Sequence, residues 1–194
     1  METTNARTIF FFGRPGSGKG TQAKRLAVDL GWQFFSTGER FRDMREGPSV
    51  LSERVRAAYD SGQLLPDWLA VFLFKDAVIP LERHEGILID GFPRTHAQAV
   101  LADEALSWLG RPYTVFNLVV SEEEAARRQL SRAQSDPRPD SDTPEKVQFR
   151  LATYRTHTEP VLQYFKDRHA CIDIDGEQSE DAIATDIRAA LSLP

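Results

Sequence analysis

Cysteine, methionine and long apolar runs are all scarce in this chain of 194 residues. The single cysteine, Cys171, excludes an internal disulfide and a zinc site built from several cysteines. No apolar run approaches the roughly 20 residues that a membrane-spanning helix needs. The polar segment 1–6 and the short apolar run 9–12 do not resemble a secretory signal peptide. We therefore expect a cytoplasmic protein with no membrane partner.

Positive charge is in deficit as well. The formal net charge is −5, whereas bulk attraction to nucleic acid or to an anionic membrane needs a surplus of accessible positive charge. We therefore expect no nucleic-acid partner. Hydrophobic residues make up 41% of the chain and charged residues 27%, which is ordinary for a folded protein with a packed core.

Short apolar runs alternate with segments of helical periodicity along the chain. This alternation predicts an α/β protein with a parallel sheet covered by helices on both faces. The expected strands span residues 7–12, 33–36, 86–89, 113–120 and 171–175. The expected helices span residues 20–30, 38–46, 50–61, 67–82, 95–109, 122–133, 144–168 and 179–193.

The segment 134–144 (QSDPRPDSDTP) contains three prolines, three aspartates and two serines, and it has no apolar residue. This composition predicts an exposed, mobile loop. Thr143 and Pro144 follow the pattern of an N-cap and a proline at the first helical position, so we expect a long helix to begin there.

A glycine-rich motif, Gly13 to Thr21 (GRPGSGKGT), follows the first expected strand and opens the first expected helix. In this context the backbone N–H groups of a glycine-rich loop converge on phosphate oxygens, and the helix N-terminus adds partial positive charge. Lys19 can reach the β- and γ-phosphates of a nucleotide, and the Thr21 hydroxyl lies close to the expected magnesium position. The motif therefore predicts a nucleotide-phosphate site.

Two further motifs end expected strands. Asp90 closes a buried strand and begins the sequence DGFPRT, so its carboxylate suits a ligand to magnesium through water. Arg94 of the same motif would point into the same crevice. The motif STGE at 36–39 follows another strand and is continued by Arg42.

Together these motifs resemble the adenylate kinase family over nearly the whole chain and in the same order. The matching segments are GxPGxGKGTQ at 13–22, STGE…R at 36–42, GxLxPD at 62–67, DGFPRTxxQA at 90–99, Arg150-Leu151…Tyr154…Thr158…Pro160…Tyr164 and IDIDG at 172–176. Gly20 separates Lys19 from Thr21, and this variant of the phosphate loop is similar to the form found in that family.

The resemblance implies a three-layer α/β/α fold of the P-loop NTPase type, with a five-stranded parallel sheet in the order 2-3-1-4-5. It implies a single nucleoside monophosphate kinase domain over residues 1–194, with a helical AMP-binding insertion and a short lid. The core would comprise 1–35, 66–132 and 143–194, the insertion about 36–65 and the lid about 133–142. The implied activity is direct in-line transfer of the γ-phosphoryl group of ATP to AMP with Mg²⁺, by a monomer.

The resemblance also implies roles for individual residues. Catalytic contacts to the transferring group are implied for Lys19, Arg94, Arg132, Arg138 and Arg150. ATP binding is implied for Gly16, Ser17, Gly18, Lys19, Gly20, Thr21, Arg128, Arg132 and Gln178. AMP binding is implied for Thr37, Arg42, Gln63, Leu64, Leu65, Gly91, Phe92, Pro93, Arg94, Gln98, Arg138 and Arg150. Magnesium would be held through water near Thr21 and Asp90.

Departures from the family pattern bear on the lid. Some relatives carry a long lid with four zinc-binding cysteines; this lid is short and has none, so no zinc site is expected. The usual Arg-x-Asp-Asp pattern reads Arg138-Pro139-Asp140-Ser141-Asp142, and Arg138 lies one residue further from Arg150 than the family spacing.

Two alternatives to an adenylate kinase stay open on the sequence. A UMP/CMP kinase of the same family is one, and Thr37 and Gln98 speak against it because they resemble the adenine-selecting members. The other is a catalytically silent nucleotide-binding module that serves as a switch or scaffold. The presence of Lys19, Arg94 and Arg150 speaks against that reading.

Overall fold

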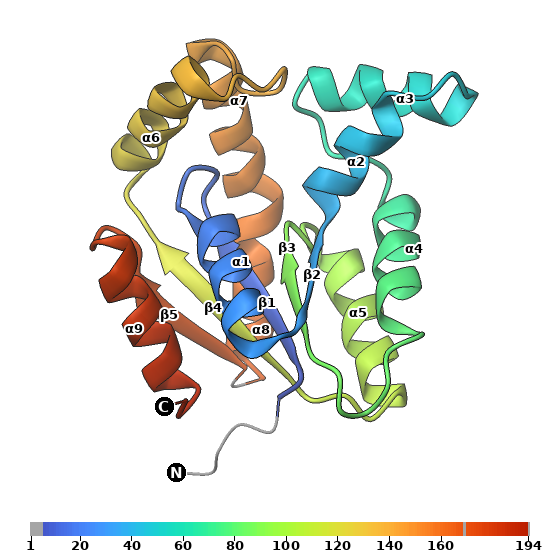
Figure 1. Cartoon of the computed structure of the whole chain (residues 1–194). Coiled ribbons are helices and arrows are strands. Elements are labelled where there is room, and N and C mark those ends of the chain that lie inside the picture. The colour runs from blue at the N-terminus through green and yellow to red at the C-terminus, as the bar shows by residue number, and fades with distance from the viewer. Residues whose placement is uncertain (1–5, 169, 194) are drawn as a thin grey trace.

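The structure, a computed structural model, describes residues 6–168 and 170–193 (Figure 1). Residues 1–5, which the sequence analysis assigned to the first core segment, lie outside the described residues, as do residues 169 and 194. Within the described ranges no helix combines the length and the apolar character that crossing a membrane would require.

Five parallel strands form the central sheet in the spatial order β2-β3-β1-β4-β5. This confirms the expected α/β class and strand order. The strands are β1 (Thr8–Gly13), β2 (Gln33–Ser36), β3 (Ile87–Asp90), β4 (Tyr113–Val119) and β5 (Cys171–Asp175). From β1 the chain moves toward one edge of the sheet, to β2, whereas from β3 it moves past β1 toward the other edge, to β4. In open parallel sheets such a reversal leaves a crevice beyond the carboxyl ends of the strands.

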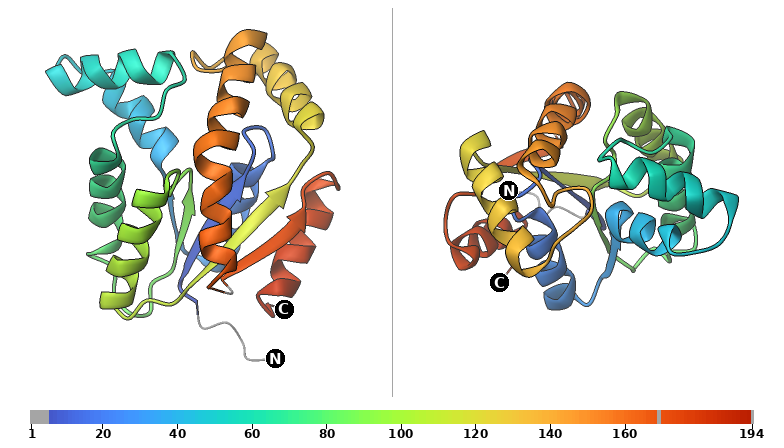
Figure 2. Two further views of the ribbon diagram at one scale, coloured as in Figure 1. Left: turned by 180° about the vertical axis from the view of Figure 1, so that it is seen from behind. Right: turned by 90° about the horizontal axis from the view of Figure 1, so that it is seen from above.

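Helices cover both faces of the sheet (Figures 1 and 2). They are α1 (Lys19–Leu30), α2 (Thr37–Arg45), α3 (Val50–Asp60), α4 (Asp67–Val78), α5 (His96–Trp108), α6 (Glu122–Ser135), α7 (Pro144–Thr153), α8 (Glu159–Lys166) and α9 (Glu180–Ala190), with a π-helical turn η1 (Tyr154–Thr158) between α7 and α8. In Figure 1, α2 and α3 rise above one side of the sheet, and α6 and α7 rise above the other.

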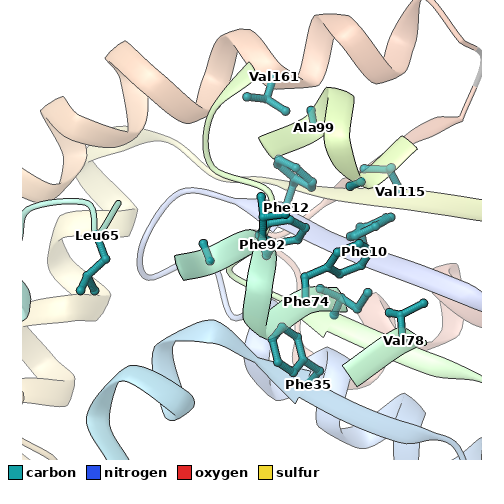
Figure 3. Packing of buried hydrophobic residues seen from close by; sticks show 14 of the residues in the cluster. Phe10, Phe12, Phe35, Leu65, Phe74, Val78, Phe92, Ala99, Val115 and Val161 are labelled. Atoms are coloured by element: carbon teal, nitrogen blue, oxygen red, sulfur yellow. The ribbon is translucent and has the colours of Figure 1, made fainter. Parts of the chain in front are cut away.

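The alternation of side chains along β1 produces two separate cores. Phe10 and Phe12 point to the face covered by α4, α5 and α8, whereas Ile9 and Phe11 point to the face covered by α1 and α9. Aromatic rings dominate the first core, where Phe10 and Phe74 pack together (Figure 3). Because both faces are sealed by large apolar side chains, the edge at the strands' carboxyl ends is left for polar groups.

Side-chain caps explain where many helices begin. Thr143 accepts a hydrogen bond from the backbone N–H of Lys146, and Pro144 occupies the first turn, which confirms the predicted start of α7. Serine or threonine caps open other helices in the same way, at Ser36, Ser49, Thr95, Ser121 and Ser179. Each cap satisfies an N–H group that has no partner within the helix.

Three predicted helices differ from the observed ones by three residues or more. The last helix, expected over 179–193, spans Glu180–Ala190. The helix expected over 67–82 ends at Val78. The single helix expected over 144–168 is interrupted by η1, where the N–H of Glu159 donates to the carbonyl of Tyr154, five residues earlier. Pro160 supplies the physical reason, because it has no N–H to donate and its ring collides with the carbonyl four residues before it.

Candidate active site

The phosphate loop connects β1 to α1 and is held close to α6. A Cβ atom at Gly16 would lie 2.4 Å from the carbonyl oxygen of Ala125, so no larger residue fits between the loop and that helix. Gly16 also has φ 94°, in the left-handed region that favours glycine. The loop therefore keeps its path because glycine allows both the conformation and the close approach.

Arg14 fastens the loop to the rest of the domain, a role that the sequence analysis missed. Its guanidinium donates to the carbonyl of Val120 at 2.9 Å and pairs with Glu159 at 3.3 Å. Its own carbonyl accepts hydrogen bonds from the N–H of Ser17 at 2.9 Å and from Lys19 Nζ at 3.4 Å. Only tertiary contacts show this role, because Arg14 stands at a variable position of the motif.

Lys19 is the loop's cation, and its surroundings weaken its hold on a proton. The pKa of Lys19 is lowered to about 8, mainly by burial; the nearby Arg94 and Arg150 act in the same direction, and Asp90 opposes them. A bound phosphate would reverse this balance by adding negative charge. The surroundings of Lys19 therefore carry an excess of positive charge when no ligand is bound.

Asp90, at the end of β3, lies directly beside the phosphate loop. β1 and β3 are neighbours, with Phe11 opposite Asp90. A Cβ atom at Gly20 would lie 3.2 Å from Asp90 Oδ2, and Oδ2 also faces Ser36 Oγ at 3.5 Å. The other oxygen, Oδ1, is buried without a hydrogen-bond partner. A buried carboxylate oxygen of this kind needs a water or a cation-bound water to satisfy it.

The DGFPR segment and α2 form a second side of the crevice. Thr37 Oγ1 donates to the carbonyl of Gly91 at 2.7 Å, and Arg94 Nε donates to the same carbonyl at 2.8 Å. Burial and the neighbouring Arg150 lower the pKa of Arg94, which two carboxylates only partly offset. Arg42 lies on α2 and donates to the hydroxyl of Tyr59 at 3.2 Å.

The lid provides the third side, and its centre is not exposed as predicted. Asp140 is 7% exposed and Ser141 is fully buried. Asp140 pairs with Arg150 of α7 at 3.2 Å, and the Ser141 hydroxyl accepts from Arg132 of α6 at 3.0 Å. The loop is turned inward because its polar groups satisfy arginines that face the crevice. Arg138 pairs with Asp136 at 3.1 Å.

These three sides enclose a cavity of about 480 Å³. Its lining contains eight basic side chains and four acidic ones, which is the reverse of the negative balance of the whole chain. The basic residues are Lys19, Lys24, Arg42, Arg94, Arg128, Arg132, Arg138 and Arg150, and the acidic ones are Glu39, Asp90, Asp140 and Glu180. A cavity with this surplus suits a ligand that carries several negative charges.

Most of the residues singled out from the sequence meet in this cavity. The cavity is lined by Gly16, Gly18, Lys19, Gly20, Thr21, Thr37, Arg42, Gln63, Leu64, Leu65, Asp90, Gly91, Arg94, Gln98, Arg128, Arg132, Arg138 and Arg150. Ser17, Phe92, Pro93 and Gln178 are not part of the lining. Phe92 stacks on Phe74 with 4.6 Å between ring centroids, inside the first core (Figure 3). Gln178 donates to Asp186 at 2.8 Å.

Several lining residues were missed from the sequence. Lys24 follows Thr21 by three positions on α1, so helical spacing could have placed it on the same face. Glu39 precedes Arg42 by the same spacing and pairs with Lys24 at 2.6 Å. Asp140 belongs to the Arg-x-Asp-Asp pattern of the lid, but that pattern did not predict its place in the cavity. Tyr59 of α3 carries no such local signal, because the fold brings it to the cavity.

The residues present fit magnesium better than zinc. Among the described residues no group of three or more His, Cys, Asp and Glu side chains could hold a metal ion, and His169 lies outside them. Magnesium keeps several waters and is usually bound through one or two carboxylates and the substrate's phosphates. The unpaired Oδ1 of Asp90, beside the start of α1, matches that pattern.

Comparison with known proteins adds independent evidence. The model of the adenylate kinase family matches residues 11–170. The adenylate kinase of Thermus thermophilus is 42% identical over 188 residues, which is 96% of this chain and 98% of the relative. The adenylate kinase of a Cyanothece species is 38% identical over 181 residues, covering 93% and 92%. That of Maricaulis maris is 38% identical over 184 residues, covering 94% and 97%.

Proposed function

This chain belongs to the adenylate kinase family and is a phosphotransferase, and from that premise we propose how its crevice transfers the γ-phosphoryl group of ATP to AMP to give two ADP. One observation carries the proposal. A single cavity brings Lys19 of the phosphate loop together with Arg94, Arg132 and Arg150, which come from three different elements. Phosphoryl transfer needs this convergence, because its barrier falls mainly through alignment and charge compensation.

On the donor side, we assign the ATP phosphates to the loop from Gly16 to Thr21. Backbone N–H groups and Lys19 would hold the β- and γ-phosphates, and Ser17 would contribute through its backbone because its side chain is buried. Arg128 and Arg132 stand one turn apart on α6 and line the same cavity. Gln178 would act from the loop whose Gly176 carbonyl accepts from Arg128 at 2.8 Å.

On the acceptor side, we assign AMP to the space between α2 and the DGFPR segment. The base would lie near Gln98 and the segment Gln63 to Leu65, which line one part of the cavity. The phosphate would lie among arginines, with Thr37 and Gly91 shaping the wall. Phe92 and Pro93 would support this wall from the core side. The arginines in question are Arg42, Arg94, Arg138 and Arg150.

In the transfer step, a phosphate oxygen of AMP forms a bond to the γ-phosphorus while the bond to the β–γ bridging oxygen breaks. The attacking phosphate is already anionic, so no side chain has to remove a proton. Lys19 keeps its proton at neutral pH, because its pKa of about 8 rises further beside phosphate. Lys19 and the arginines compensate the charge of the transferring group and hold the two reacting oxygens in line.

We propose Mg²⁺ as the cofactor, held through water by Asp90 and close to Thr21. Bound with ATP, the ion would neutralise charge on the β- and γ-phosphates. Chelating magnesium in the assay should therefore abolish turnover, and adding it back should restore it. A chelator-resistant activity would contradict this assignment.

We also propose the family's internal organisation for this chain. Residues 36–65 would act as the AMP-binding insertion and 133–142 as a short lid, on a core formed by 1–35, 66–132 and 143–194. Closing the lid over the nucleotides would exclude water, which would otherwise take the phosphoryl group. The cytoplasmic location and the monomeric state remain predictions from the sequence.

A coupled assay with ATP and a panel of monophosphates tests the proposed function. We expect kcat/KM for AMP to exceed the values for GMP, UMP and CMP by at least about 10²-fold, because mismatched bases leave buried polar groups unpaired. Gln98→Leu should narrow this gap mainly by raising KM for AMP. Equal turnover of CMP or UMP would overturn AMP as the acceptor, and no transfer to any monophosphate would overturn the kinase function.

A further inference from the structure

Asp67 lies behind the proposed base site and holds the side chain of Gln98. It is the first residue of α4, and it does not belong to the residues that line the cavity. Asp67 Oδ1 accepts a hydrogen bond from Gln98 Nε2 at 2.7 Å. The same oxygen accepts from Thr95 Oγ1 at 3.0 Å. Asp67 therefore acts on any ligand only through other side chains.

The second end of the Gln98 amide is also held. Gln98 Oε1 accepts from the backbone N–H of Arg94 at 2.7 Å. A carboxylate can only accept and a backbone N–H can only donate, so both partners demand the same orientation of the amide. Turning the amide over would place its oxygen against Asp67 and its NH₂ group against the N–H of Arg94.

This arrangement leaves Gln98 with one free donor and one free acceptor. A glutamine amide has two N–H donors and two acceptor sites on its oxygen, and the two partners use one of each. Gln98 is 2% exposed and lines the cavity, so the remaining donor and acceptor are available to a ligand there. Asp67 and Arg94 together determine which end of the Gln98 amide is the donor and which is the acceptor.

A base edge with an amino donor beside a ring-nitrogen acceptor, as in adenine, pairs with this order. Hypoxanthine and guanine present the reverse order, with an oxo acceptor beside a ring N–H donor. They would require the amide to turn over, which costs the hydrogen bonds to both partners. Hydrogen bonds to charged groups are stronger than neutral ones, so the bond to Asp67 is the larger part of that cost.

We propose that Asp67 is a positioning residue that determines base specificity, by fixing the orientation of the Gln98 amide for a 6-amino purine. This inference rests on the proposed role of Gln98 in binding AMP. The competing explanation is structural: Thr95 and Gln98 form a capping pattern at the start of α5, and Asp67 would merely tie α4 to it.

IMP is the informative probe, because it differs from AMP at the edge that Gln98 would read and lacks the 2-amino group of GMP. The quantity to measure is the ratio of kcat/KM for AMP to that for IMP. Asp67→Asn keeps the size of the side chain while removing the obligatory acceptor, and Asp67→Ala removes the contact altogether. Asp76→Asn, on the exposed part of the same helix, is the matched control.

We expect both Asp67 variants to lower the AMP/IMP ratio by about 10-fold, the size of one hydrogen bond to a charged group. The change should appear mainly in KM, with kcat nearly unchanged and the control at the parent ratio. In a Gln98→Leu background, Asp67→Asn should change the ratio no further.

The outcomes separate this inference from the function on which it rests. A lower melting temperature with an AMP/IMP ratio within about twofold of the parent would leave Asp67 with a structural role and overturn the proposal. An additional change in the Gln98→Leu background would overturn the route through Gln98. A parent enzyme that does not phosphorylate AMP would instead overturn the proposed acceptor.

Discussion

Lys19 of the phosphate loop shares one crevice with Arg138 and Arg150, and the difference between them is whether an acid already neutralises the cation. In the loop, Lys19 reaches a backbone carbonyl at 3.4 Å, and no carboxylate among the described residues lies within ion-pair distance of it. Arg138 of the segment 133–142 pairs with Asp136 at 3.1 Å, and Arg150 of α7 pairs with Asp140 of that segment at 3.2 Å.

This difference indicates two ways of preparing a phosphate site. Within the described ranges Lys19 has no carboxylate partner, so in the proposed function a substrate phosphate would supply the negative charge. Acids of the segment 133–142 neutralise Arg138 and Arg150, so in the proposed function a phosphate would have to take the place of those acids. In the proposed function, the unpaired Lys19 would favour phosphate binding, whereas the paired arginines would stabilise the ligand-free protein and would exchange their acids for phosphate when the nucleotides bind.

Replacing the loop's cation should have the largest effect. We expect Lys19→Met to lower kcat by on the order of 10²-fold or more, because a contact to the transferring group is lost. The unfolded chain holds the Lys19 proton more tightly than the native protein does, so the melting temperature at pH 7 should stay level or rise. Steady-state kinetics and calorimetry measure both, with Lys75→Met as the control. Near-normal turnover would contradict the role given to Lys19.

Removing the buried acid of the lid should have a moderate effect. Asp140→Asn leaves Arg150 without its anionic partner, and we expect the melting temperature of the ligand-free protein to fall by about 3–5 °C. The rise in melting temperature on adding saturating ADP should be larger than in the parent, because phosphate no longer competes with a carboxylate. Asp136→Asn, which breaks the more exposed pair of Arg138, should lower the melting temperature by less than about 2 °C. Equal losses of melting temperature in the two variants would contradict the distinction between the buried pair of Asp140 and the exposed pair of Asp136.

The state of Lys19 should also be visible in proton uptake. Its pKa of about 8 in the free protein should rise when phosphate binds. Binding of ATP without magnesium at pH 8.5 should then take up roughly half a proton or more, and less at pH 7. Titration calorimetry in buffers of different ionisation enthalpy measures this uptake. Lys19→Met should abolish the difference between the two pH values, and a difference that persists would assign it to another group.

Zinc should make no difference at all. The lid segment 133–142 contains no cysteine or histidine, so a zinc chelator should leave both the melting temperature and the activity in magnesium unchanged. Elemental analysis of the purified protein provides an independent check. A stoichiometric zinc ion would contradict the view that the lid is held by arginine–acid pairs.

The two sides of the crevice also differed in how well the sequence predicted them. The path of the phosphate loop follows from glycines and from the junction of β1 and α1, so a local motif was enough to identify it. The lid was predicted as exposed because its composition is polar, yet Asp140 and Ser141 are buried. Their burial depends on Arg132 and Arg150, which lie on different helices, and no local pattern contains that information.

The sequence by itself determined the α/β class, the phosphate loop and most of the residues that meet in the cavity. These features depend on periodicity, on strand–helix alternation and on motifs within a few residues of each other. The tertiary structure decided what Arg14 and Asp67 do. Arg14 connects the phosphate loop to Val120 and Glu159, and Asp67 accepts a hydrogen bond from Gln98 of another motif. It also decided that Phe92 belongs to the core rather than to the cavity wall. Such roles arise from contacts between distant segments, and the position of a residue in the chain does not show which distant groups will reach it.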